Sequence, residues 1–262
     1  MSRIGAIARL VWTEMLRTRE AYVLLILLLA VLLGLMSLNV FGLSSTAGYL
    51  KDAGLLVVWV LGWILTLNVS VRQIPREEER GTLWPLLAKP ISRFEFVAGK
   101  WLGAWGAAAV ALLAFYLLVA GLVLARGGTL SAAALAQAYL LHAAALAVVA
   151  ALGILLSARL TRDAAAVLGY VLTGSAFVIL PRIPTLLAAQ QGAGNVGLWI
   201  FYYLMPHFEL FDMRRRLVHD FGPAPWPAAA AVLAYGAVLT ALLLVLAWLA
   251  YRGKRYSRGR AG

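Results

Sequence analysis

Cysteine is absent from the 262 residues of this sequence, which excludes disulfide bonds, thiolate catalysis and cysteine-based metal sites. Charge is scarce as well, because Asp, Glu, Lys and Arg make up 13% of the chain, compared with about 25% in a typical soluble domain. Hydrophobic residues make up 63%, well above the usual share of about 45–50%. A soluble fold cannot hide so much apolar surface, so the composition indicates an integral membrane protein.

Motifs for nucleotide binding and catalysis are also missing. A phosphate loop has the pattern G-x-x-x-x-G-K-[ST], but the Gly99-Lys100 pair lacks the first glycine and is followed by tryptophan. No G-x-S-x-G serine motif occurs, and His142, His207 and His219 form no H-E-x-x-H zinc motif. We therefore expect no catalytic residue, no metal site and no cofactor in this chain.

Long apolar runs are what the sequence has in place of these motifs. A helix rises about 1.5 Å per residue, so about 20 apolar residues cross a hydrocarbon core about 30 Å thick. Six runs are candidates, at residues 21–43, 53–71, 95–124, 132–158, 164–180 and 227–251. The sequence thus predicts an all-α integral membrane fold with six transmembrane helices, in a single domain of residues 1–262.

Two other segments are expected to be helical without spanning the bilayer. In residues 3–19 apolar side chains recur at helical spacing and the arginines lie largely off that stripe. This pattern predicts an amphipathic helix in the membrane interface, and an ordinary helical lead-in to the first span is the alternative. Residues 181–226 form a long interval before the last span, in which we expect short helices.

Lysine and arginine assign the two sides of the membrane. Most of the 23 basic residues lie in the N-terminal segment, in residues 72–100, in residues 159–162 and in the tail 252–262. Six spans put both termini on one side, and the positive-inside rule makes that side cytoplasmic. Residues 181–226 then lie outside the cytoplasm, and the tail is a basic cytoplasmic segment. Topology also explains the net charge of +12, so we expect no nucleic-acid partner.

The charged stretch 72–106 separates two of the apolar runs. Pro75 can begin a short helix with the glutamates 77–79 in its first turn, where a helix dipole favours acidic groups. Ser92 and Glu95 have the spacing of a capping box, which predicts that the next span starts there. Between these points lies an apolar patch too short to span, made of Leu83, Trp84, Leu86 and Leu87.

The run from Glu77 to Gly103 resembles the signature of ABC-2 type transporter permeases. The matching residues are Glu79, Gly81, Thr82, Leu83, Leu86, Leu87, Pro90, Ser92, Arg93, Phe96, Gly99 and Lys100. Pro85, inside the short apolar run, departs from the pattern. The resemblance implies a cytoplasmic coupling segment at 76–90 that presses on a separate ATPase. Its contact residues would be Glu77, Glu78, Glu79, Arg80, Gly81, Thr82, Leu83, Trp84, Leu86 and Leu87.

The resemblance also implies an assembly. Two permease copies, most simply a homodimer, would sit in the cell inner membrane on two ABC ATPase subunits. ATP and Mg would be bound by those ATPase subunits and not by this chain. The expected function is the permease of an ATP-driven exporter that hydrolyses nothing itself.

Small and polar residues inside the predicted spans mark contacts between helices. Gly99 and Gly103 form a small-xxx-small motif, which indicates close packing within the chain or at a dimer face. Asn68, Gln137 and His142 are candidate pathway residues, because polar groups in the bilayer are costly and are often functional. For His142 a structural hydrogen bond between helices is the alternative.

Two other functions stay open at this point. A scaffold subunit would pass ATP-driven motion through residues 181–226 to a periplasmic partner, as some relatives are thought to do in copper-enzyme maturation or gliding motility. An integral membrane enzyme would use His142 or the acidic residues of the 181–226 segment.

Overall fold

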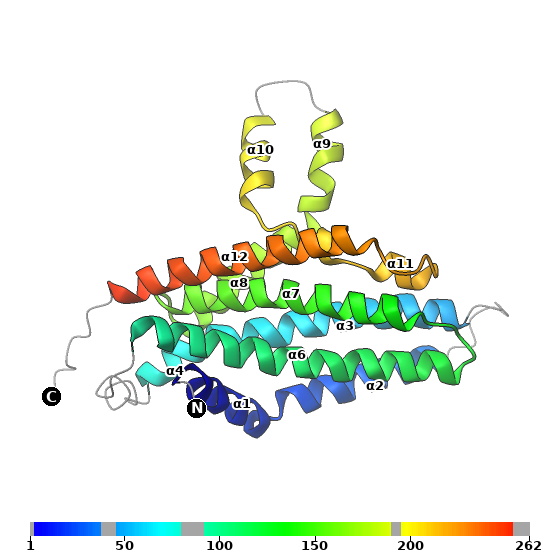
Figure 1. The fold of residues 1–262 in the computed structure, drawn as a ribbon, viewed down its shortest axis with the longest axis horizontal. Coiled ribbons are helices and arrows are strands. Elements are labelled where there is room, and N and C mark those ends of the chain that lie inside the picture. The colour runs from blue at the N-terminus through cyan, green and yellow to red at the C-terminus, as the bar shows by residue number, and fades with distance from the viewer. Residues whose placement is uncertain (1–2, 38–45, 80–91, 190–194, 254–262) are drawn as a thin grey trace.

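The computed structural model describes residues 3–37, 46–79, 92–189 and 195–253. Within those ranges every regular element is a helix, and no strand occurs. Figure 1 shows long helices side by side in one bundle, with a hairpin of two short helices projecting from its side. The all-α prediction is therefore confirmed for the described part of the chain.

Five helices in the described residues are long and apolar enough to cross a membrane. They correspond to α3 (Thr46–Val71), α6 (Arg93–Ala125), α7 (Ala132–Ser157), α8 (Arg162–Val178) and α12 (Trp226–Arg252). The first predicted span corresponds to α2 (Glu20–Ser37), whose apolar part is shorter, and residues 38–43 lie outside the described ranges. The described residues thus contain five candidate spans, whereas the sequence predicts six in the whole chain.

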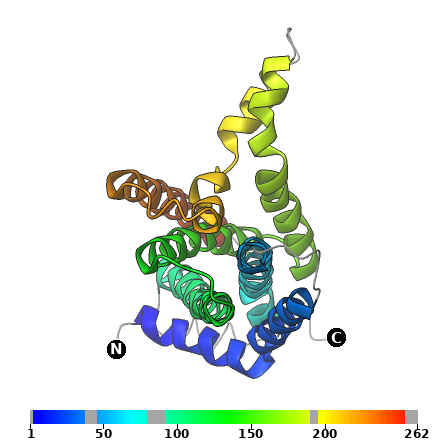
Figure 2. The same cartoon turned by 90° about the vertical axis from the view of Figure 1, so that its right-hand side faces the viewer.

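α1 (Arg3–Thr18) lies across the long helices instead of running along them, as Figure 2 shows. Its main neighbour is α6. Ile7 and Val11 are buried, whereas Arg9 and Arg17 are exposed. α1 therefore has the amphipathic division that the sequence predicts for residues 3–19, with its apolar side turned toward the bundle.

The centre of the bundle is formed by α3, α6 and α7, with α12 packed along α7. In the most apolar 18-residue stretch of each span, 72% of α7 is buried inside the structure. The corresponding share is 28% for the span that contains α8 and 22% for α12. The buried face of α7 is rich in alanine and glycine, which let neighbouring helices approach closely. α8 and α12 therefore turn wide apolar faces away from the bundle.

α4 (Gln73–Glu79) follows α3 with a single turn residue, Arg72, between them. The sequence predicts that Pro75 begins this helix and that the glutamates occupy its first turn, and the structure shows that this prediction is wrong. The Gln73 side chain donates to the Val69 carbonyl at 2.9 Å, which links α4 to the last turn of α3. Pro75 is tolerated as the third residue because N–H groups in a first turn have no intrahelical partner. The glutamates therefore lie in the last turn.

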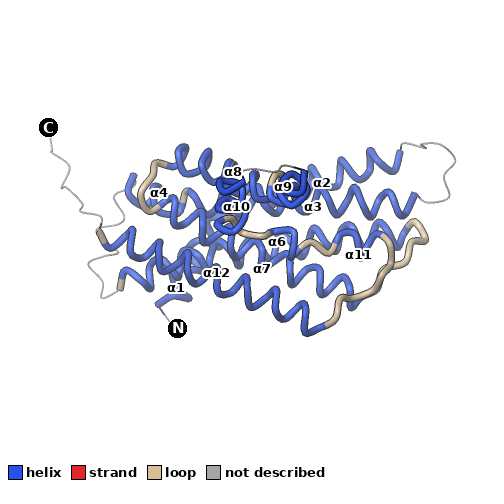
Figure 3. The backbone as a smooth tube through the Cα atoms, turned by 90° about the horizontal axis from the view of Figure 1, so that it is seen from above, coloured by secondary structure: helices blue, strands red, loops and turns tan. Residues whose placement is uncertain are grey.

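The interval 181–226 contains the expected short helices. They are α9 (Ile183–Ala189), α10 (Asn195–Leu204) and α11 (Arg214–Val218), with the 3₁₀ turns η1 (Leu180–Arg182) and η2 (Phe208–Phe211). α9 and α10 make the projecting hairpin of Figure 1. α11 lies toward the end of the bundle that is opposite to the first and last described residues, as Figure 3 shows.

Candidate functional site

α4 is attached to two neighbouring helices by ion pairs. The Lys100 side chain on α6 is only 3% exposed, and its ammonium donates to Glu77 Oε1 at 2.6 Å. The Arg76 guanidinium donates to the Glu14 carboxylate on α1. Coulomb attraction is stronger where water is excluded, so the Lys100 pair is a stronger link than an exposed pair would be. The two pairs join α4 to both α1 and α6.

The predicted coupling residues lie on this helix and beyond it. Glu77 is in the ion pair with Lys100, Glu78 is half-buried and Glu79 is exposed at the end of α4. The others lie outside the described residues, as Pro85 does: Arg80, Gly81, Thr82, Leu83, Trp84, Leu86 and Leu87. The structure therefore describes the beginning of the 76–90 segment, in α4, and the chain after it from Ser92 onward.

The start of α6 is held by a capping box. Ser92 Oγ accepts from the Glu95 backbone N–H at 3.1 Å, and Glu95 Oε2 accepts from the Ser92 N–H at 2.7 Å. Arg93 donates in addition to the carbonyls of Tyr251 and Arg252 at the end of α12. The residues directly after the coupling segment therefore cap α6 and also bind the end of α12.

Gly99 and Gly103 face α1. A Cβ built at Gly99 would lie 2.7 Å from the Ile7 Cβ. A Cβ at Gly103 would lie 2.6 Å from the Val11 Cβ and 2.9 Å from the Ala8 carbonyl oxygen. All three separations are shorter than a real Cβ contact, so these glycines are what allows α1 to pack directly on α6.

Gly103→Ala is expected to destabilise the protein by about 1–3 kcal/mol, the usual cost of overpacking, because its Cβ meets backbone as well as side chain. Gly106→Ala on the same helix is the matched control, since nothing lies within 4 Å of its Cβ. Thermal unfolding of the detergent-solubilised variants measures the difference. Equal melting temperatures for the two variants would show that α1 does not pack there.

Gln137 and Asn68 are two of the predicted pathway residues, and their surroundings differ. Gln137 is buried on α7, where its amide nitrogen donates to the Ala224 carbonyl at 3.1 Å and its Oε1 accepts from the Ala224 N–H at 2.7 Å. The nitrogen and the oxygen of this side-chain amide therefore both bind the backbone just before α12. Asn68 is exposed on α3.

His142, the third of these residues, is buried between helices. Its ring stacks on Trp59 of α3 with the ring centres 3.9 Å apart, and its Nδ1 lies 3.4 Å from the Tyr116 hydroxyl on α6. Nε2 has no hydrogen-bond partner among the described residues. His142 thus joins α3, α6 and α7 by one stacked contact and one polar contact.

An ion pair that the sequence does not predict lies at the other end of the bundle. Lys51 near the start of α3 is 3% exposed and donates to both carboxylate oxygens of Asp220, at 2.8 and 2.9 Å. Asp220 has a backbone φ of +52°, a conformation that L-residues rarely adopt. The pair links α3 to the chain just after α11.

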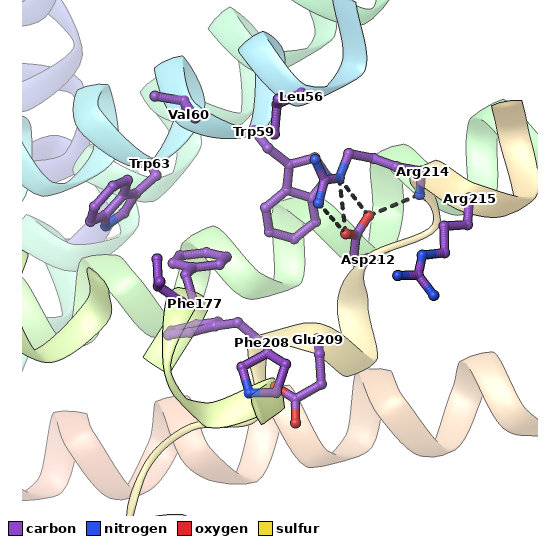
Figure 4. Close-up of a pocket in the computed structure, with 12 residues that line it drawn as sticks. Leu56, Trp59, Val60, Trp63, Phe177, Phe208, Glu209, Asp212, Arg214 and Arg215 are labelled. Atoms are coloured by element: carbon purple, nitrogen blue, oxygen red, sulfur yellow. Dashed lines mark hydrogen bonds and ion pairs between the residues drawn. The ribbon is translucent and has the colours of Figure 1, made fainter. Parts of the chain in front are cut away.

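A pocket of about 620 Å³ lies between α3, α8 and the 181–226 segment, as Figure 4 shows. Its aromatic walls are Trp59 and Trp63 from α3, Phe177 from α8 and Phe208 from η2. The Phe177 and Phe208 rings stack with their centres 4.7 Å apart, and Phe177 lies 5.6 Å from each tryptophan ring. These four residues come from distant parts of the chain, and no local sequence pattern groups them.

The charged side of this pocket comes from the 181–226 segment. Glu209, Asp212, Arg214 and Arg215 all line it. Arg214 Nε donates to the two Asp212 oxygens at 3.0 and 2.9 Å, and the Arg214 backbone N–H donates to Oδ1 at 2.9 Å. Asp212 and Arg214 therefore neutralise each other.

The described residues contain five apolar helices long enough to cross a membrane, which places this molecule in the class of multi-pass helical membrane proteins. A family model described as ABC-2 family transporter protein matches residues 6–254, which is nearly the whole chain. The chain therefore belongs to the ABC-2 family of transporter proteins, the membrane components of ABC transporters. Comparison with curated proteins finds no match.

Proposed function

We propose that this chain is the permease subunit of an ATP-driven ABC exporter. Two copies would pair in the cell inner membrane, with both termini in the cytoplasm, on two ATPase subunits that bind ATP and Mg. Family membership supports the permease assignment. The attachment of α4 to α1 and α6 supports the coupling step.

Coupling requires that a push on the 76–90 segment reaches the spanning helices. α4 follows α3 with a single turn residue between them, and the Lys100–Glu77 pair joins it to α6 at the same level. The capping box fixes the first turn of α6 directly after the segment. A displacement of the segment would therefore move α3 and α6 together, and α1 would follow through Glu14.

A charge reversal at Glu79 tests this proposal. Glu79 is exposed at the end of α4, so Glu79→Lys leaves the fold intact but reverses the charge that the ATPase would meet. We expect permease-dependent ATPase activity to fall about tenfold, since a mismatched charge at a contact costs on the order of 1–2 kcal/mol. The measurement is ATP hydrolysis by the ATPase that copurifies with the wild-type chain.

The matched control is Asp52→Lys, the same reversal at an exposed acid at the other end of the bundle. That variant should hydrolyse ATP at the wild-type rate. If Glu79→Lys assembles with the ATPase and keeps wild-type coupling, then the segment that begins at α4 is not the contact.

A further inference from the structure

We propose that the aromatic pocket between α3, α8 and the 181–226 segment binds a protonated amine carried on an apolar body. The inference names a substrate class and rests on the proposed function in one respect, because binding there is taken as the recognition step of transport. The pocket volume of about 620 Å³ suits one drug-sized molecule, since such sites measure about 300–1,000 Å³.

The charges of the pocket favour a cation inside it. Asp212 is neutralised by Arg214 through two side-chain hydrogen bonds and one backbone hydrogen bond. Glu209 has no ion pair among the described residues, and its Oε2 is shielded from solvent without a hydrogen-bond partner. Glu209 lines the pocket, so its negative charge lies at the pocket wall without a counterion among the described residues. A bound N–H donor with a positive charge would pair with this carboxylate through a charge-assisted hydrogen bond.

The walls favour an apolar body next to that charge. Aromatic faces attract cations through their quadrupole and also bury apolar surface. The Phe177 and Phe208 rings stack on each other in Figure 4, and Trp63 lies beyond Phe177. One face of Trp59 is already covered by His142, so this ring is held in place before any ligand arrives.

The rim explains how such a molecule would reach the pocket. Leu56 on α3 and Val178 at the end of α8 line the pocket and are 48% and 58% exposed. These apolar edges lie on spanning helices, so an amphiphile can arrive from the lipid phase. Arg214 is ion-paired with Asp212, and Arg215 is exposed at the pocket. An anion would therefore pair with Arg215 at the rim and not bind among the aromatic rings.

Equilibrium binding to the full-length chain in phosphatidylcholine nanodiscs tests the inference. The probes are monodansylcadaverine, its neutral N-acetyl derivative and a dansyl amino acid with a carboxylate in place of the amine. We expect the amine to bind at least about tenfold more tightly than the acetylated form, because a charge-assisted hydrogen bond is lost on acetylation. Empty nanodiscs measure partition into lipid.

Variants of the chain test which side chain causes the preference for the amine over the acetylated probe. Glu209→Gln keeps the shape of the side chain and should remove most of the preference for the amine, whereas Asp52→Asn should keep it. Val178→Trp narrows the pocket at an exposed position and should weaken binding of all three dansyl probes alike. Equal binding of amine and acetylated probe, preference for the carboxylate, or no binding above empty nanodiscs would each overturn the inference.

A change of lipid in the nanodiscs tests whether the natural ligand is a lipid headgroup or a free amine. Phosphatidylethanolamine carries a primary ammonium headgroup, whereas phosphatidylcholine has no N–H donor. If the natural ligand is the lipid, phosphatidylethanolamine nanodiscs will weaken probe binding by competition, and an unchanged affinity points to a free amine. Binding needs no ATPase, so loss of amine selectivity with intact coupling removes only this inference, and the reverse result removes only the coupling proposal.

Discussion

Gly153→Ala is expected to destabilise the protein by about 3 kcal/mol, the upper end of the usual cost of overpacking. The Cβ of that alanine would lie 2.0 Å from the Ser70 Oγ and 2.8 Å from the Ser70 Cβ. A rotation of Ser70 relieves the first clash but not the second, because its Cβ moves only with the backbone of α3. The two helices at the centre of the bundle would therefore have to separate.

A second substitution makes this expectation specific. Ser70→Gly removes both clashing atoms, so the double variant Gly153→Ala/Ser70→Gly should recover most of the lost stability. Gly121→Ala on α6 is the control, since nothing lies within 4 Å of its Cβ. The melting temperature and the monodisperse fraction after solubilisation are measured for the wild type, Gly153→Ala, the double variant and Gly121→Ala. A Gly153→Ala variant that melts with the wild type would contradict the close approach of α3 and α7.

Local chemistry explains why most helix boundaries could be predicted from the sequence. α7 begins after Ser131, whose side chain accepts from the Ala134 N–H, and α6 begins at its capping box. α12 at Trp226–Arg252 agrees within one residue with the predicted span 227–251. These limits depend on hydropathy and on caps a few residues long, which a single sequence contains. Thr161 takes the N-cap position of α8 but makes no side-chain cap bond.

The contacts that build the sites could not be predicted in the same way. Lys51 and Asp220 are 169 residues apart, and nothing local in the sequence pairs them. Trp59 meets His142 only because α3 and α7 pack together. The start of α4 was predicted two residues late, since the Gln73 bond to Val69 links that turn to α3. Pairing between helices is a property of the bundle, and one sequence does not specify it.

Glu77→Gln is expected to cost about 3–5 kcal/mol, because it leaves the ammonium of Lys100 buried without its carboxylate. Lys100 is only 3% exposed, and its other described contact is a cation–π contact at 5.8 Å from the Phe96 ring centre. Lys100→Met should cost less, because it keeps the apolar stem and Glu77 is 19% exposed and nearer to water. Thermal unfolding of the two single variants measures this asymmetry.

The double variant Glu77→Gln/Lys100→Met separates stability from coupling. It places an apolar side chain in the buried site with no charge left over, so its melting temperature should return close to that of the wild type. The link between α4 and α6 stays broken, and permease-dependent ATP hydrolysis should therefore remain low. Arg3→Gln is the control, since the Arg3–Glu95 pair is long at 3.9 Å and Arg3 is 56% exposed, so that pair contributes little. A stable double variant with full coupling would mean that the push reaches α6 without this ion pair, through the backbone that leads into the capping box.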